Sequence, residues 1–379
     1  IGVSAFENCE VLSKLTLPQS LQSLGNSAFM NCASLQSAVV PTGVTLIGEA
    51  AFAGCVSMKT VELADGVSII GDGAFYGCES LQTVKLGSGI TKIKPFAFFG
   101  CDVADVNYGG DVASWCKIQG LETLLENGFD FYLSGEKVTT LTIPETVESA
   151  NEEMFRKISS IEKVIFKNNA TSIGSNAFNG CENLTTVELG DSINNIGSYA
   201  FANSNLQNVY YTKDIADWCQ LTNFGTENNP MYYARNLYIK GELLVDLVIP
   251  ETVTQIKYKT FENCQSIESV TLHDNVTSIG SSAFYNCIKL KTLKAGDVVA
   301  SIGSNAFAES GLQNVYYTKT MEDWCNLDLT AGERNPMYYA QNLYVGDSLV
   351  ENLVIPAAVT AIKENAFYNC RSIKSVEIP

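Results

Sequence analysis

The chain has 379 residues, of which 46% are hydrophobic and 17% are charged, and its formal net charge is −17 at pH 7. This apolar content is enough to bury a large core and excludes an intrinsically disordered chain. Nucleic acids and anionic membranes bind clustered Lys and Arg, so the acidic balance argues against both as partners. The longest apolar runs are far too short for membrane insertion of this segment.

A phenylalanine recurs every 23 residues within several groups, usually after Ala and with Cys three residues later. Such a period is typical of solenoids, in which each repeat buries its apolar face against its neighbours. We therefore expect these phenylalanines to point into a shared core. Gly often stands four residues earlier and indicates a tight turn or a close backbone approach. The phenylalanines are Phe6, Phe29, Phe52, Phe75, Phe98, Phe155, Phe178, Phe201, Phe261, Phe284, Phe307 and Phe367.

Each phenylalanine is followed by a pattern of the form L-x-x-V-x-L, whose alternation is typical of a half-buried strand. Further copies lack the phenylalanine, and together they predict about fifteen short parallel strands. Most follow one another after 22 or 23 residues, but three longer rungs with excursions lie near 107–141, 210–247 and 316–353. Because the pattern resumes after each, we expect one solenoid domain over 1–379. The strand centres are residues 15, 38, 61, 84, 106, 141, 164, 187, 209, 247, 270, 293, 315, 353 and 376.

Nine of the twelve cysteines hold the position three residues after the phenylalanine. Equivalent side chains on adjacent rungs are too far apart for a disulfide, so we interpret these cysteines as buried thiols. The other three follow the tryptophans Trp115, Trp218 and Trp324, all within the long rungs. We expect each Trp-Cys pair to lie on a short amphipathic helical turn that covers the core, with a binding role for the tryptophans as the alternative.

The second and third long rungs repeat the motif NPMYYA, at 229–234 and 335–340. Proline fixes a turn there, and Tyr233, Leu237 and Tyr238 are expected to pack down as lid residues. Tyrosine also supplies large contact area at low entropic cost, and loops on rigid scaffolds often bind ligands. Tyr232 and Tyr338 are therefore candidate ligand-binding residues.

The outward side of the predicted sheet is a second candidate surface. Most of its residues are Thr, Lys and Glu, and they form either a solvated ladder or a binding surface. Tyr210 and Tyr316 differ from this background, because each adjoins a strand tyrosine and precedes an excursion.

No set of residues in the sequence indicates a catalytic centre. His273 is the only histidine, so no Ser-His-Asp or Cys-His arrangement is available, and no cofactor or metal site is expected. A carboxylate pair for glycoside hydrolysis stays open in so acidic a chain, although no spacing singles one out.

The repeat resembles the BspA-like (Treponema-type) leucine-rich repeats of bacterial surface proteins. The resemblance rests on segments such as CENLTTVELGDSINNIGSYAF and CQSIESVTLHDNVTSIGSSAFYNC and covers nearly the whole chain. It implies a right-handed leucine-rich-repeat solenoid of the α/β type, export to the cell surface and binding to host proteins or other cells, without catalytic residues. No signal peptide is visible in the chain. Because the chain begins and ends within repeat units, we expect an excerpt of a longer protein.

We therefore interpret the chain as a non-catalytic adhesion module whose partner is a host extracellular protein or glycan. The alternatives are a spacer that presents another domain, a carbohydrate-active enzyme and an intracellular scaffold.

Overall fold

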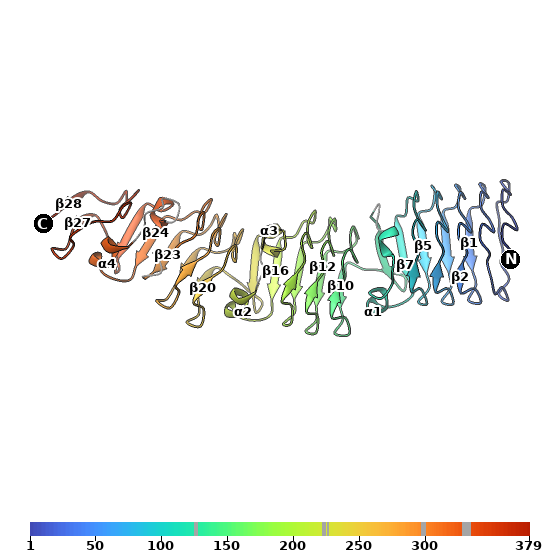
Figure 1. Cartoon of the computed structure of the whole chain (residues 1–379), viewed down its shortest axis with the longest axis horizontal. Helices are drawn as coiled ribbons and strands as arrows, with labels where there is room; N and C mark the ends of the chain where they lie inside the picture. The colour runs from blue at the N-terminus through green and yellow to red at the C-terminus, as the bar shows by residue number, and fades with distance from the viewer. Residues whose placement is uncertain (125–127, 222–224, 226, 297–300, 328–334) are drawn as a thin grey trace. The chain divides into compact units, whose positions relative to one another are not determined.

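The structure is a computed structural model that describes the chain except for residues 125–127, 222–224, 226, 297–300 and 328–334. The chain forms a leucine-rich-repeat solenoid, in which successive rungs add parallel strands to a sheet (Figure 1). It divides into two compact units, which are described separately. The first comprises Ile1–Thr185 and Ile196–Asn205, and the second comprises Thr186–Asn195 and Leu206–Pro379. A single domain over 1–379 stays a prediction.

In the first unit the main sheet grows by one strand per rung, with exact register. Thr60 pairs with Thr83 and Leu63 with Leu86, so equivalent side chains lie side by side. Two-residue strands pair along a second line. The main strands are β1 (Ser37–Val40), β3 (Thr60–Leu63), β5 (Thr83–Leu86), β7 (Asp105–Tyr108), β8 (Asp130–Leu133) and β9 (Glu136–Lys137), followed by β10 (Thr140–Ile143) and β12 (Lys163–Phe166). The short strands are β2 (Leu46–Ile47), β4 (Ile69–Ile70), β6 (Lys92–Ile93), β11 (Ser149–Ala150) and β13 (Ser172–Ile173).

The second unit repeats this plan. Its main strands form three sets, each parallel apart from two-residue antiparallel strands. These sets are β14 (Thr186–Leu189), β16 (Asn208–Tyr211), β17 (Asn236–Ile239) and β18 (Glu242–Leu243); β19 (Asp246–Val248), β21 (Ser269–Thr271), β23 (Thr292–Ala295), β24 (Asn314–Tyr317), β25 (Asn342–Val345) and β26 (Ser348–Leu349); and β27 (Asn352–Val354) with β28 (Ser375–Glu377). The short strands are β20 (Gln255–Ile256) and β22 (Ser278–Ile279), and β15 (Asn195–Ile196) contains one residue of each unit.

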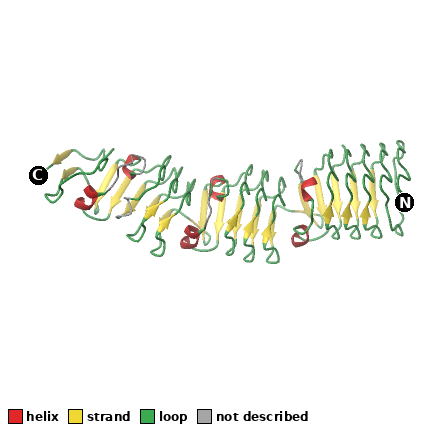
Figure 2. Cartoon of the chain, viewed as in Figure 1, coloured by secondary structure: helices red, strands yellow, loops and turns green. Residues whose placement is uncertain are grey.

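The helices are short and lie beside the last strands of the sheets (Figure 2). Side-chain caps explain where the Trp-Cys helices begin, because the Asp111 and Thr320 side chains accept hydrogen bonds from backbone amides of the first turn. Asn229 caps the NPMYYA helix in the same way, and Pro230 is the first residue of this helix, where proline is favoured. The helices are α1 (Val112–Trp115), η1 (Leu121–Thr123), α2 (Ile215–Gln220), α3 (Pro230–Tyr233), α4 (Met321–Asn326) and η4 (Pro336–Tyr338).

The core consists of strand side chains on one side and the recurring phenylalanines on the other. Val61 and Leu63 are buried while Thr60 and Glu62 are exposed, as the alternation predicts. Phe29 and Phe52 are fully buried, and their rings stack at 5.3 Å between centroids. Phe6 does not follow the expectation. It belongs to the first rung, has a ring neighbour on one side only, and is 43% exposed.

Each phenylalanine lies between two backbone positions in the left-handed region. Around Phe29 these are Ser27 (φ 53°) and Asn31 (φ 58°). Asn and Gly tolerate this region, which explains their frequency two residues after the phenylalanine. The Gly four residues before the phenylalanine instead allows the backbones of adjacent rungs to approach closely. A Cβ at Gly48 would lie 2.5 Å from the backbone of Gly25.

Several cysteine thiols that follow the recurring phenylalanines are hydrogen-bonded to the preceding rung. The Sγ atom of Cys55 donates to the carbonyl oxygen of Phe29 (3.3 Å), and Cys287 repeats this contact with Phe261 (3.2 Å). Burial raises the pKa of the Cys32 thiol to about 11 and that of Cys116 to about 12. The thiols of Cys32 and Cys116 therefore stay protonated at neutral pH and are poor nucleophiles.

Fourteen of the fifteen strand centres lie in strands, while the segment around Leu15 does not pair as one. The sequence also missed the two-residue strands β9, β18 and β26 and three longer strands inside the long rungs, namely β8, β17 and β25. Each pairs in parallel with the strand before the excursion, and the chain then folds back as a two-residue antiparallel strand. A long rung is thus an additional rung plus a hairpin, after which a new sheet begins.

Candidate functional site

The NPMYYA motif joins the end of one sheet to the first turn of the next. The Asn229 side chain accepts a hydrogen bond from the Met231 amide (2.9 Å) and donates one to the Lys259 carbonyl oxygen (2.8 Å). The second copy repeats both contacts, since Asn335 bonds to Met337 (2.9 Å) and Asn365 (2.7 Å). Both asparagines are fully buried. The motif is therefore part of the scaffold.

The second and third Trp-Cys helices also join the end of one sheet to the first turn of the next. Trp218 and Trp324 are fully buried, and their Nε1 groups donate to the carbonyl oxygens of Thr260 (3.0 Å) and Ala366 (2.9 Å). Trp115 is buried as well and packs edge-on against Tyr108, but its Nε1 has no partner among the described residues.

Two tyrosine pairs stand on the outward side of the sheets in the second unit. Tyr210 of β16 is in register with Tyr238 of β17, and their rings stack at 4.1 Å with 11° between their planes. Tyr316 and Tyr344 repeat this arrangement at 4.1 Å and 12°. All four rings are half-buried. Tyr238 and Tyr344 therefore do not pack down as lids, because the strand places Leu237 and Leu343 in the core and turns the tyrosines outward.

An asparagine pair lies beside each tyrosine pair. Asn236 donates to Asn208 at 2.9 Å, and Asn342 donates to Asn314 at 2.9 Å. A leucine of the antiparallel strand completes each surface, because Leu243 is paired with Tyr238 and Leu349 with Tyr344. We define the first platform as Asn208, Tyr210, Asn236, Tyr238 and Leu243, and the second platform as Asn314, Tyr316, Asn342, Tyr344 and Leu349.

The platforms differ in the charged residue on the preceding strand. Glu188 is in register with Tyr210, whereas Lys294 is in register with Tyr316 and its Nζ lies 5.5 Å from the ring centroid. Desolvation and the neighbouring Tyr238 raise the pKa of Tyr210, and desolvation and Tyr344 raise that of Tyr316. The phenols therefore keep their protons at neutral pH and act as hydrogen-bond donors and acceptors.

Tyr232 and Tyr338, the other two candidates, lie on the NPMYYA turns and are 43% and 42% exposed. Their surroundings differ. Tyr232 lies near the Nζ atom of Lys259 (5.8 Å to the ring centroid), whereas Tyr338 stacks on Tyr368 at 5.5 Å. The two turns share a backbone but present different surfaces.

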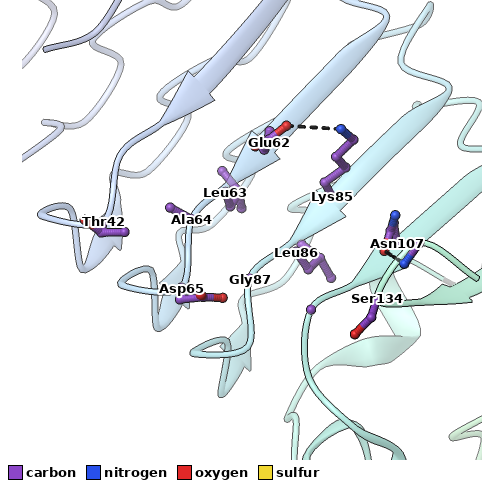
Figure 3. Close-up of a pocket in the computed structure, with 12 residues that line it drawn as sticks. Thr42, Glu62, Leu63, Ala64, Asp65, Lys85, Leu86, Gly87, Asn107 and Ser134 are labelled. Atoms are coloured by element: carbon purple, nitrogen blue, oxygen red, sulfur yellow. Dashed lines mark hydrogen bonds and ion pairs between the residues drawn. The ribbon is translucent and has the colours of Figure 1, made fainter. Parts of the chain in front are cut away.

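The first unit has a polar hollow of about 440 Å³ at the corresponding position of its sheet (Figure 3). Lys85 Nζ lies 3.2 Å from Glu62 on the adjacent strand, and Asn107 follows on the next. Hydrogen bonds from the amide and hydroxyl of Ser88 lower the pKa of Asp65 in its wall. A glycosidase needs a carboxyl group whose pKa is raised, so Asp65 does not fit the role of general acid.

A model of the BspA type leucine-rich repeat region matches the chain in six copies, over residues 1–117, 128–230, 232–326 and 340–379. The chain belongs to this family. No curated protein matches it. Across its described residues, no helix of this BspA-type chain is long and apolar enough to cross a membrane.

Solved structures of three bacterial proteins are similar to this BspA-type chain. A leucine-rich repeat protein from Bacteroides ovatus is 22% identical, with a TM-score of 0.42, over 86% of this chain and 77% of its own. A leucine rich cell surface protein from Faecalibacterium prausnitzii is 22% identical, with a TM-score of 0.31, over 97% and 86%. A leucine-rich repeat protein from Eubacterium ventriosum is 20% identical, with a TM-score of 0.33, over 73% and 83%.

Proposed function

We propose that the chain is a non-catalytic recognition or adhesion module of an extracellular bacterial surface protein. Its partner is a host extracellular protein or glycan, bound through the outward side of the sheets. The main support is that two half-buried platforms on the outward side repeat the same tyrosine geometry, with 4.1 Å between ring centroids in both cases.

Packing alone does not account for this repetition. The first sheet has Asn107 and Tyr132 where the platforms have two tyrosines, and it still pairs in register. A tyrosine pair is therefore not required to close a sheet. Tyrosine and asparagine together provide rigid contact area and adaptable hydrogen bonding, which is the composition of binding surfaces in antibodies. Tyr232 and Tyr338 add exposed aromatic area on the NPMYYA turns.

The test is binding of the purified chain to a panel of extracellular-matrix proteins and glycans. The chain with Tyr210→Ala and Tyr316→Ala should lose the binding, while the control Tyr76→Ala should keep it. Tyr76 is a suitable control because it is an exposed aromatic residue (49%) of the first unit. Binding that survives the double substitution would exclude the platforms, and absence of binding to the whole panel would favour a spacer. Turnover of a glycan would overturn the non-catalytic assignment.

A further inference from the structure

The stacking of the tyrosines determines which parts of their rings face a ligand. At 4.1 Å and 11–12° the inner faces of each pair cover one another. Lys294 covers the remaining face of Tyr316. Asn amides and an exposed leucine lie beside each pair. Tyrosine and asparagine side chains beside an exposed leucine are the composition of surfaces that bind polypeptides. We therefore take a polypeptide as the occupant.

Both platforms belong to the same compact unit. Tyr210 and Tyr316 lie five main-strand steps apart, and the step from β17 to β19 crosses from one sheet to the next; taking each step as one rung of about 4.8 Å gives roughly 25 Å. An extended polypeptide rises about 3.3 Å per residue, so roughly eight residues bridge the two platforms. A single ligand segment is long enough to contact both.

The charged neighbours distinguish the two platforms, because each lies on the strand before the first tyrosine of its pair. Glu188 lies beside the first platform and Lys294 beside the second. A ligand with a basic residue at one end and an acidic residue at the other is complementary in one direction and repelled in the other.

We infer that the two platforms bind one extended polypeptide segment at the same time, and that Glu188 and Lys294 set its direction. The segment carries two apolar or aromatic anchors about eight residues apart, a basic residue near the first platform and an acidic residue near the second. This inference rests on the proposed function and specifies its partner.

The probe is a phage-displayed library of random peptides of about 15 residues, long enough to cover the roughly 25 Å span. The library is selected on the purified chain, and a synthetic copy of the enriched peptide is titrated by calorimetry. We expect one peptide per chain. Removing one platform, with Tyr210→Ala and Tyr238→Ala or with Tyr316→Ala and Tyr344→Ala, should weaken binding by about 100-fold or more, because the second contact is intramolecular. Tyr76→Ala should leave the affinity unchanged.

Two independent sites would give two peptides per chain, and removing one platform would halve the stoichiometry at constant affinity. That result overturns simultaneous binding but keeps the platforms as sites. Undiminished binding after removal of both platforms overturns the proposed function as well. If the library yields no enriched peptide, or if a glycan array shows binding that depends on the four tyrosines, the polypeptide assignment is wrong.

Direction is tested by exchanging the charges. Glu188→Lys combined with Lys294→Glu should weaken binding of the selected peptide by about two- to fivefold or more, as expected for exposed charge pairs. A peptide whose terminal charges are exchanged should regain the lost affinity on this variant. Equal affinity of both peptides for both proteins would exclude a role of these charges in direction.

Discussion

The substitution Phe284→Ala tests whether the stacked phenylalanines hold the second unit together. Phe284 is fully buried, and its ring stacks on Phe261 at 5.3 Å and on Phe307 at 5.3 Å. Removing a buried phenylalanine costs about 3–5 kcal/mol. Each aromatic contact is worth about 0.5–1.5 kcal/mol beyond burial, so we expect the upper half of that range, at about 4 kcal/mol.

The matched control is Phe367→Ala, which removes the equivalent phenylalanine from the last rung. Phe367 is only half-buried, so its removal should cost roughly half as much, in proportion to buried area. Urea unfolding followed by circular dichroism gives the free energy of unfolding, and hydrogen exchange of residues 261–307 shows where the loss occurs. Equal costs at the two positions, or a cost below about 1.5 kcal/mol at Phe284, would refute the packing role.

Three further predictions concern the excursions and the thiols. Trp324→Phe should lower the free energy of unfolding by about 1–3 kcal/mol more than Trp115→Phe, because only Trp324 has a bonded Nε1; equal losses in urea titrations would contradict this. Asn229→Ala removes a buried donor and a helix cap, so we expect a loss of about 2–3 kcal/mol in the same assay, whereas an unchanged midpoint would show that the NPMYYA turn does not join the sheets. At pH 8 one thiol per folded chain, the exposed Cys9, should react rapidly with a disulfide reagent, and rapid reaction of the buried cysteines before unfolding would be inconsistent with the thiol–carbonyl bonds.

The repeating part of the fold follows from the sequence because each position meets its own copy one rung away. The spacing of Phe29 and Phe52 therefore predicts both the rung and the direction of the side chain. The strands that the sequence missed are not marked by this period. Asn236–Ile239 follows a 28-residue step from the strand before it, so the 23-residue period does not point to it.

A signal for this strand was nevertheless present. The segment NLYI repeats the Asn, apolar, Tyr, apolar order of NVYY at 208–211. Aligning the two segments would have paired Tyr210 with Tyr238 and identified both platforms. The contact between Asn229 and Lys259 could not be predicted from the sequence. A hydrogen bond from a side chain to a carbonyl oxygen 30 residues away places no requirement on the type of the accepting residue.

Oxidative footprinting of the chain, with and without its partner from the binding panel, tests whether the platforms are the recognition surface. We expect protection of Tyr210, Tyr238, Tyr316 and Tyr344 in the complex and unchanged oxidation of Tyr76. Full oxidation of all four tyrosines in a saturated complex would contradict this expectation.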